Sequence, residues 1–418
     1  MFSQAMMTKL VMAVGFLAGA VGAHPRTGHA GPANAKTLYF LTNNAENAVV
    51  AIPLDGSGML SLKGSAVVKT AGAGANGISG ATNQSAMPDS LFSQAALTVS
   101  DDSLFAVNPG SNTVTMFSLS SSSCAPVRLG SPVPLPAGAS FPVTVAASAR
   151  HRLVCVGTSG GTGGVTCAPF TPGTGISSVG FDALRPFDLQ QSTPPVGPTN
   201  TVSHVLFNAD ESLLLATVKG NPATNKTGFL ASFPIAASQG QKSIMMVAQS
   251  GTKTTPPNTA VLFGSAPIPH SDSVLVTDAS FGAAVLSIDH TTTTGLVVAE
   301  KSRAVIAGQK ATCWAAISPA TGTGFVTDVA RNLLVEIGLT DGAQTGVLGE
   351  IDLSPATSDP GLIDLAAAGT LVYALSPGNG TVGAAISVVD VKMRKLVQHV
   401  ELAGVGANGN AMGLALGF

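Results

Sequence analysis

Short apolar runs alternate with turns rich in Gly, Asn, Pro and Ser along most of the chain. The stretch LFAVNPGSNTVTMFSL, residues 104–119, is representative: two apolar, β-branched runs flank the turn Asn-Pro-Gly-Ser-Asn. Runs of roughly four to eight such residues, bounded by turn formers, are typical of strands joined as hairpins. The pattern therefore predicts an all-β protein.

The hairpin recurs along the chain. Seven copies occur, at intervals of 47 to 66 residues between their first residues. The copies begin at Leu38, Leu104, Leu153, Leu213, Val274, Phe325 and Val372. A self-similar period of this length is typical of repeat architectures and decides the fold before any single motif is considered.

Most hairpins are preceded by a further short apolar run and followed by a looser strand. Four strands per repeat and seven repeats predict a seven-bladed β-propeller over residues 37–418, in which ring closure buries both faces of every blade. The first repeat lacks an inner strand before Leu38. The segment NAMGLALGF, residues 410–418, has the expected pattern. We expect this C-terminal strand to pair into blade one and to close the ring.

Two glycine runs share the spacing G-x-G-x-x-G: AGAGANG at residues 71–77 and AGVGANG at 403–409. A dinucleotide site with this spacing would follow a strand and open a helix, with an acidic residue about 20 positions later. Here ISGATNQ follows the first run, and the chain ends shortly after the second. We interpret both runs as connectors between blades, with Gly supplying positive φ angles. The sequence predicts no cofactor.

The N-terminus has the pattern of a secretory signal over residues 1–23. Lys9 precedes a short apolar run, and Val-Gly-Ala at 21–23 suits a cleavage site. A Gly/Ala/Pro-rich spacer at 24–36 follows. We therefore expect a secreted, extracellular protein without a membrane span in the mature chain. Three glycosylation sequons then become candidates: Asn83, Asn225 and Asn379.

The chain has four cysteines. Cys155 and Cys167 flank the Gly-rich loop of the third hairpin, so they lie on adjacent antiparallel strands at a separation that suits a disulfide. Cys124 and Cys313 belong to blades two and six and are expected to lie too far apart to pair. No C-x-x-C motif or spaced His set occurs, and the sequence predicts no metal site.

Composition limits the partners. Only 10% of residues are charged and the formal net charge is −2, so there is no basic surface of the kind that nucleic acid requires. High apolar content with few charges argues against disorder. We expect a monomer whose partner is an unidentified small molecule or an extracellular or cell-wall ligand.

The repeats resemble a known family. The inner-strand turns NAD, SPA and SDD and the hairpins VTD and VNPGSNTV resemble the seven-bladed lactonase propellers, which include 6-phosphogluconolactonases and 3-carboxymuconate cyclases. The signal peptide, the hairpin VCVGTSGGTGGVTC and the run TCWAAISP are most similar to secreted fungal cyclase-like glycoproteins. The resemblance implies a propeller whose chemistry, where present, uses His, Arg and carboxylates around one end of the channel.

We call that end the mouth: the face that carries the starts of the inner strands, the loops between second and third strands, and the connectors between blades. His204, in SHVLF, matches the inner-strand histidine of the family and is the candidate acid or base. The other candidate binding residues at the mouth are Lys219, Asp278, Asp328, Arg331 and Asp364.

Each candidate also has a structural interpretation. His204 could be a hydrogen-bonded inner-strand residue, and Asp278 and Asp328 could cap their own turns. With few cations to hold an anionic substrate, the sequence favours a binding or antigen glycoprotein with weak or lost catalysis. The alternative is an active lactone hydrolase or carboxymuconate cycloisomerase that uses His204.

Overall fold

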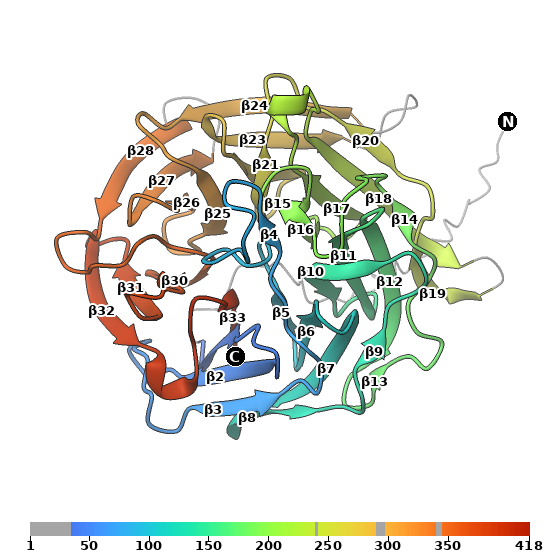
Figure 1. Ribbon diagram of the computed structural model, residues 1–418, viewed down its shortest axis with the longest axis horizontal. Helices are drawn as coiled ribbons and strands as arrows, with labels where there is room; N and C mark the ends of the chain where they lie inside the picture. The colour runs from blue at the N-terminus through green and yellow to red at the C-terminus, as the bar shows by residue number, and fades with distance from the viewer. Residues whose placement is uncertain (1–34, 239–240, 290–296, 340–344) are drawn as a thin grey trace, which may run out of the picture.

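The computed structural model describes residues 35–238, 241–289, 297–339 and 345–418. Within these residues the chain forms seven antiparallel blades, each with a four-strand path, arranged around a central axis (Figure 1). The predicted all-β, seven-bladed propeller is confirmed. The predicted signal peptide and all of the predicted spacer before Ala35 lie outside the described residues.

The blades follow the chain in order. From the inner strand outwards, blade one consists of β33 (Met412–Gly417), β1 (Thr37–Leu41), β2 (Ala48–Pro53) and β3 (Ala66–Lys69). Blade two consists of β5 (Leu97–Ser100), β6 (Ser103–Asn108), β7 (Thr113–Ser120) and β8 (Ser123–Arg128). Blade three consists of β10 (Ser140–Ser148), β11 (Leu153–Gly160), β12 (Gly164–Thr171) and β13 (Gly175–Ile176). Blade four consists of β16 (Val202–Phe207), β17 (Leu213–Val218), β18 (Phe229–Ser238) and β19 (Gln241–Val247).

The remaining blades have the same order. Blade five consists of β21 (Leu262–Pro267), β22 (Ser273–Asp278), β23 (Gly282–Asp289) and β24 (Val297–Val305). Blade six consists of β25 (Thr312–Ile317), β26 (Gly324–Asp328), β27 (Leu333–Leu339) and β28 (Thr345–Asp352). Blade seven consists of β29 (Leu365–Ala368), β30 (Leu371–Ser376), β31 (Ala385–Asp390) and β32 (Lys395–Glu401).

Short elements lie in the connectors. They are the strands β4 (Ile78–Ser79), β9 (Val133–Pro134), β14 (Arg185–Pro186), β15 (Val196–Gly197) and β20 (Thr252–Thr254), and the 3₁₀ turns η1 (Pro222–Thr224) and η2 (Ala403–Val405). No described helix is long and apolar enough to cross a membrane.

The ring closes as the sequence predicts. The C-terminal strand β33 pairs antiparallel with β1, so that Leu38 faces Leu416 and Tyr39 faces Ala415. Blade one therefore contains strands from both ends of the chain, and the pairing of β33 with β1 closes the ring. The inner position of β33 explains why the first repeat has no inner strand of its own before Leu38.

The burial of the strands follows from the packing of neighbouring blades. Every residue of β17, LLLATV, is buried because both faces of the blade contact another blade, whereas in the outer strand β24 exposed and partly exposed residues alternate and only Ala304 is buried. Aromatic pairs bridge the blades: Phe105 of blade two meets Phe170 of blade three edge-on, with ring centroids 4.8 Å apart. Such contacts add to the area that each interface buries.

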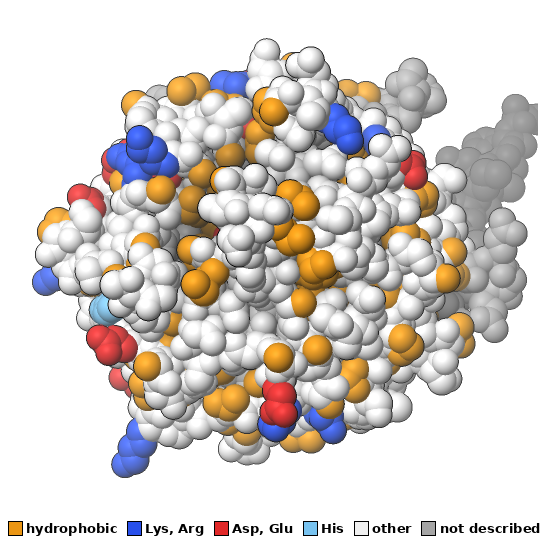
Figure 2. All heavy atoms as spheres, in the orientation of Figure 1, with side chains coloured by type: hydrophobic (Ala, Val, Ile, Leu, Met, Phe, Trp, Pro, Cys, Tyr) orange, Lys and Arg blue, Asp and Glu red, His pale blue; other side chains and the backbone are white. Residues whose placement is uncertain are grey.

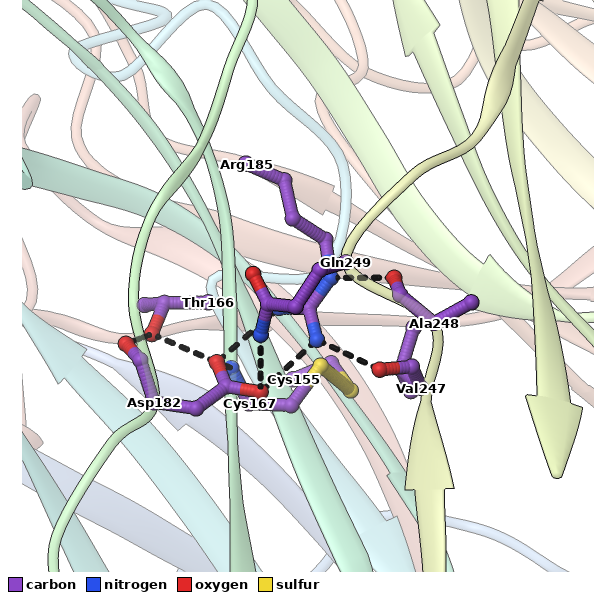
Figure 3. Close-up of a disulfide and its surroundings, with 8 residues drawn as sticks. All are labelled: Cys155, Thr166, Cys167, Asp182, Arg185, Val247, Ala248 and Gln249. Carbon is purple, nitrogen blue, oxygen red and sulfur yellow. Dashed lines mark hydrogen bonds and ion pairs between the residues drawn. A yellow bond between two sulfur atoms is a disulfide. The ribbon is translucent and has the colours of Figure 1, made fainter. Parts of the chain in front are cut away.

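Blade three contains the predicted disulfide. Cys155 and Cys167 lie directly opposite each other on β11 and β12, with their Cα atoms 4.1 Å apart, and are bonded (Figure 3). The Cys167 amide donates to Asp182 Oδ1 (2.8 Å), and the same carboxylate accepts two bonds from the guanidinium of Arg185. Arg185 also donates to the Val247 carbonyl of blade four (2.7 Å). The disulfide therefore adjoins a polar contact that ties blade three to blade four.

The glycines of AGAGANG serve a different purpose from the predicted one. Gly72, Gly74 and Gly77 do not have positive φ angles. Instead, a Cβ atom at Gly74 would lie 2.3 Å from the backbone of Asn43, and one at Gly77 would lie 2.4 Å from the ring of Phe92. These glycines permit close approach of the connector to its neighbours. In the second run, Gly406 does have a positive φ, of 78°.

Candidate functional site

The mouth of the channel is closed by its own chain. The connector from blade one to blade two runs from residue 70 to residue 96, and its last part, Ser90–Ala96, crosses the start of the inner strands. We call Ser90–Ala96 the plug. Ser90, Leu91 and Ser93 have no exposed surface. The plug thus fills the position at which the sequence analysis placed a candidate site.

Hydrogen bonds join the plug to five blades. Ser93 Oγ donates to the Val143 carbonyl of blade three (2.6 Å), and the Gln94 amide N–H donates to the Ser203 carbonyl of blade four (2.9 Å). The side-chain amide of Gln94 makes two hydrogen bonds to the backbone of Ala315 in blade six: Nε2 donates to the carbonyl (2.9 Å), and Oε1 accepts from the N–H (3.1 Å). The same Nε2 reaches blade five, and the backbone of the plug reaches blade seven through Asp364. The plug therefore has a defined conformation.

A second layer covers the plug. The connector between blades three and four contributes β15, which pairs in parallel with β4 of the first connector. Phe92 of the plug packs where Gly77 and Gly197 leave room, since a Cβ atom at either glycine would meet its ring. β4 and β15 lie over the centre of the ring in Figure 1. In Figure 2 the charged side chains visible on this face lie mainly towards its rim.

His204 is held beneath the plug. It lies on β16, is 7% exposed, and its Nδ1 shares a hydrogen bond with Ser265 Oγ of blade five (2.9 Å). Burial lowers the pKa of His204 to about 3. The imidazole is therefore neutral at physiological pH: it is a weak base, and its protonated form, which could donate a proton, is scarcely populated.

Lys219 is buried and hydrogen-bonded to the plug. It is 2% exposed, and its Nζ donates to the Phe92 carbonyl (2.5 Å) and to Ser203 Oγ (2.9 Å) while lying 4.3 Å from the centroid of the Phe263 ring. Burial lowers the pKa of Lys219, and it raises the pKa of the neighbouring Asp89. Asp89 Oδ1 is sequestered without a hydrogen-bond partner among the described residues. The ammonium group is thus not available to hold a ligand.

Asp364 anchors the plug on its other side. The carboxylate accepts hydrogen bonds from the Ala95 amide (3.1 Å) and from its own neighbour Leu365 (2.8 Å). Burial raises the pKa of Asp364 to about 7, against the lowering effect of these N–H donors. Asp364, His204 and Lys219 therefore all lie next to the plug, but no hydrogen bond joins one of them to another.

Asp278 and Asp328 occupy equivalent positions in blades five and six. Asp278 accepts from the Ala260 amide (2.7 Å), and Asp328 accepts from the Lys310 amide (2.8 Å), so each fixes the connector that enters its own blade. Arg331 pairs with Glu350 (3.2 Å) on the outer strand. These three residues serve local contacts and do not converge with His204.

The three sequons lie where the blade order predicts. Asn83 is in the connector from blade one to blade two, and Asn225 and Asn379 are in loops between second and third strands, all on the mouth face. All three residues are exposed. Glycosylation itself stays a prediction.

The remaining polar features add no metal ligands. Among the described residues, no group of three or more His, Cys, Asp or Glu could hold a metal ion. Cys124 and Cys313 are free thiols, and burial raises the pKa of Cys313 well above its ordinary value.

The plug was not predicted from the sequence, and neither were the roles of Asp89, Ser93 and Gln94. One signal was present: the connector from residue 70 to residue 96 is far longer than an ordinary link between strands. Loops longer than about 12–15 residues in compact domains are usually functional or disordered. Its length could therefore have marked this connector as a feature of the mouth.

Known proteins match this chain by structure alone. No protein-family model matches it, and no curated protein matches it. Among solved structures, a periplasmic gluconolactonase from Pseudomonas aeruginosa aligns over 92% of this chain and 99% of its own, with a TM-score of 0.63 and 16% identity. A putative 6-phosphogluconolactonase from Bacteroides uniformis aligns over 70% of this chain and 80% of its own, with a TM-score of 0.51 and 15% identity. The chain therefore has a lactonase-like propeller fold.

Proposed function

We propose that the chain is a secreted propeller glycoprotein that binds an extracellular or cell-wall ligand and in which lactonase chemistry is weak or lost. One observation carries the proposal: the plug occupies the mouth and bonds to five blades. A substrate would have to displace this segment before it could reach His204 from that side.

The candidate residues support the same conclusion. Proton transfer by a positioned side chain contributes about 10²–10⁴-fold to a rate, whereas enzymes commonly achieve roughly 10⁶-fold or more. Positioning and charge-stabilising groups must supply the difference. Lys219 is bonded to the plug, and Arg331 is paired with Glu350 on the outside of blade six. Neither cation is free to orient an anionic substrate beside His204.

The surface of the mouth suits display rather than rapid exchange of substrate. The N-terminal sequence has the pattern of an export signal. Glycans on Asn83, Asn225 and Asn379, all exposed on this face, would crowd the approach to the channel.

Turnover measurements test the proposal. The purified mature protein should hydrolyse gluconolactone and convert 3-carboxymuconate no faster than a His204→Ala variant does. His270→Ala, at an exposed turn of blade five, is the matched control. Robust turnover that disappears in His204→Ala but persists in His270→Ala would establish the enzymatic alternative instead. Circular dichroism of each variant would verify that its fold is intact.

A further inference from the structure

The channel continues beneath the plug as a cavity that reaches the opposite face of the ring. It has a volume of about 280 Å³ and is bordered by inner-strand residues of all seven blades. We call it the cup. Gln94 of the plug lies at its closed end, and the ends of the inner strands, such as Pro267 and Ile317, lie at its open end. The cup is thus a blind site, separate from the mouth.

The side chains that line the cup are mainly apolar. Eight of its 22 lining residues are alanine, which leaves room at the centre of the ring where larger side chains would fill it. None of the lining side chains is a carboxylate, an ammonium or a guanidinium. A ligand that carried a charge would lose its hydration without gaining a partner, and such burial is strongly unfavourable.

Only four of the lining residues have polar side chains: Gln94, Thr98, His204 and Ser265. Both Nε2 and Oε1 of the Gln94 side chain are hydrogen-bonded to the backbone of Ala315. The imidazole of His204 is 93% buried, and its Nδ1 is fixed by Ser265. Its Nε2 makes no hydrogen bond to any described residue, which leaves one unpartnered polar atom in a residue that borders the cup.

We propose that the cup binds a small, uncharged, mainly apolar molecule that carries one hydroxyl group, with the hydroxyl on Nε2 of His204. This inference rests on the proposed function only in treating the protein as a binder. A hydroxyl group both donates and accepts, so it matches either tautomer of the imidazole. The volume of the cup, about 280 Å³, lies just below the usual range for ligand pockets, about 300–1,000 Å³, and therefore limits the ligand to a small molecule.

The same chemistry excludes a sugar or a sugar lactone as the occupant. Such a ligand carries several hydroxyl groups, and each one that is buried without a partner is unfavourable. The walls offer one free nitrogen and the partly exposed Thr98. The cup therefore selects against the substrates named for the structural neighbours.

Calorimetric titration with 2-naphthol tests the inference, with 2-naphthoate as the charged analogue of similar shape. We expect 2-naphthol to bind at one site, at least tenfold more tightly than 2-naphthoate. His204→Phe should weaken 2-naphthol binding about tenfold, because it removes the nitrogen. Ala266→Phe should abolish binding by filling the cup. Ala149→Phe, at a half-buried turn on the same face outside the cup, should leave binding unchanged.

Three results would overturn the inference: no binding of 2-naphthol, equal binding of both compounds, or equal weakening by Ala149→Phe and Ala266→Phe. If the variants fail to fold, as judged by circular dichroism, the affinities of the wild-type protein for the two compounds still show whether it prefers the uncharged one. Failure here would leave the proposed function intact, since that depends on lactone turnover. Lactone turnover, in turn, would refute the proposed function without affecting binding at the cup.

Discussion

Lys219 and Phe92 are separated by 127 residues in the chain, yet the Nζ of Lys219 lies 2.5 Å from the carbonyl oxygen of Phe92. Lys219 directly follows the second strand of blade four, and Phe92 belongs to the plug. Lys219 is the only lysine among the candidate mouth residues, and this hydrogen bond joins it to the plug that closes the mouth. Because of this contact, Lys219 is buried and is not available as a cation for a ligand beside His204.

Replacement of Lys219 by Met should destabilise the protein. The substitution leaves the Phe92 carbonyl and the Ser203 hydroxyl without their donor, and an unsatisfied buried group costs about 1–3 kcal/mol. The substitution also removes the cation beside the buried Asp89 carboxyl group, and the loss of one partner of a buried pair is destabilising. Urea unfolding should show a decrease of at least about 1 kcal/mol. Lys69→Met, which breaks the exposed pair with Glu46, should change stability by less than about 1 kcal/mol; equal effects of the two substitutions would contradict the role of Lys219.

His204 should make the folded state sensitive to acid. Its pKa is about 3 when folded and about 6.5 when unfolded, so between these values the unfolded chain binds the extra proton. Stability is therefore full above pH 6.5 and falls as the pH drops towards 3. Relative to His204→Gln, the wild-type free energy of unfolding should decrease by about 1.4 kcal/mol per pH unit in this window. If the free energy of unfolding depends on pH in the same way in both proteins, the pKa of His204 is not lowered by folding.

Asp364 should give a dependence of opposite sign. Burial raises its pKa to about 7 from 3.8, so the folded protein binds a proton that the unfolded chain has lost. The stability contribution is full below pH 3.8 and is lost as the pH rises towards 7. Relative to Asp364→Asn, the wild type should become less stable across this window. A difference between the two proteins that does not change with pH, measured by the same unfolding assay, would argue against a buried carboxyl group.

Much of the fold could be predicted from the sequence because each blade repeats the same local pattern. The apolar runs and turns placed all seven hairpins, and the unmatched last strand placed β33 beside β1. Cys155 and Cys167 could be paired because they flank one hairpin loop. These features depend on neighbours in the chain or on the closure of a ring.

The plug could not be placed in the same way. Ser90–Ala96 belongs to no strand, and its partners Val143, Ser203 and Ala315 come from three different blades. No periodicity signals such contacts, because they depend on how the blades are arranged in space. The role of Gly74 was misjudged for the same reason, since the atoms it accommodates belong to Asn43 in a separate loop.

Loss of the disulfide should reduce stability without opening the ring. A bond that closes a loop of 12 residues contributes about 3 kcal/mol in the chain-entropy model. The double variant Cys155→Ala/Cys167→Ala should therefore unfold at lower urea concentration than the wild type. Cys124→Ala, which removes a free thiol, is the control and should have a much smaller effect. Peptide mapping that joined Cys155 to Cys124 would contradict the pairing.

Expression through a eukaryotic secretory pathway should produce glycans at Asn83, Asn225 and Asn379, because all three acceptors are exposed. Mass spectrometry before and after enzymatic deglycosylation would identify the modified sites. Substitution of each Asn by Gln should remove one glycan and leave the fold intact. A protein that remains unmodified in such a host would contradict the prediction that it is a secreted glycoprotein.

Native-state hydrogen exchange of the plug tests the closed mouth most directly. The amides of Gln94 and Ala95 donate to Ser203 and Asp364, and the Val145 amide of β10 donates to Ala95. If the plug is a fixed part of the ring, these three amides should exchange only through global unfolding, with the same free energy as the core amides of β17. Exchange of Gln94 and Ala95 through a local opening well below the global free energy, while β17 stays protected, would contradict a permanently closed mouth.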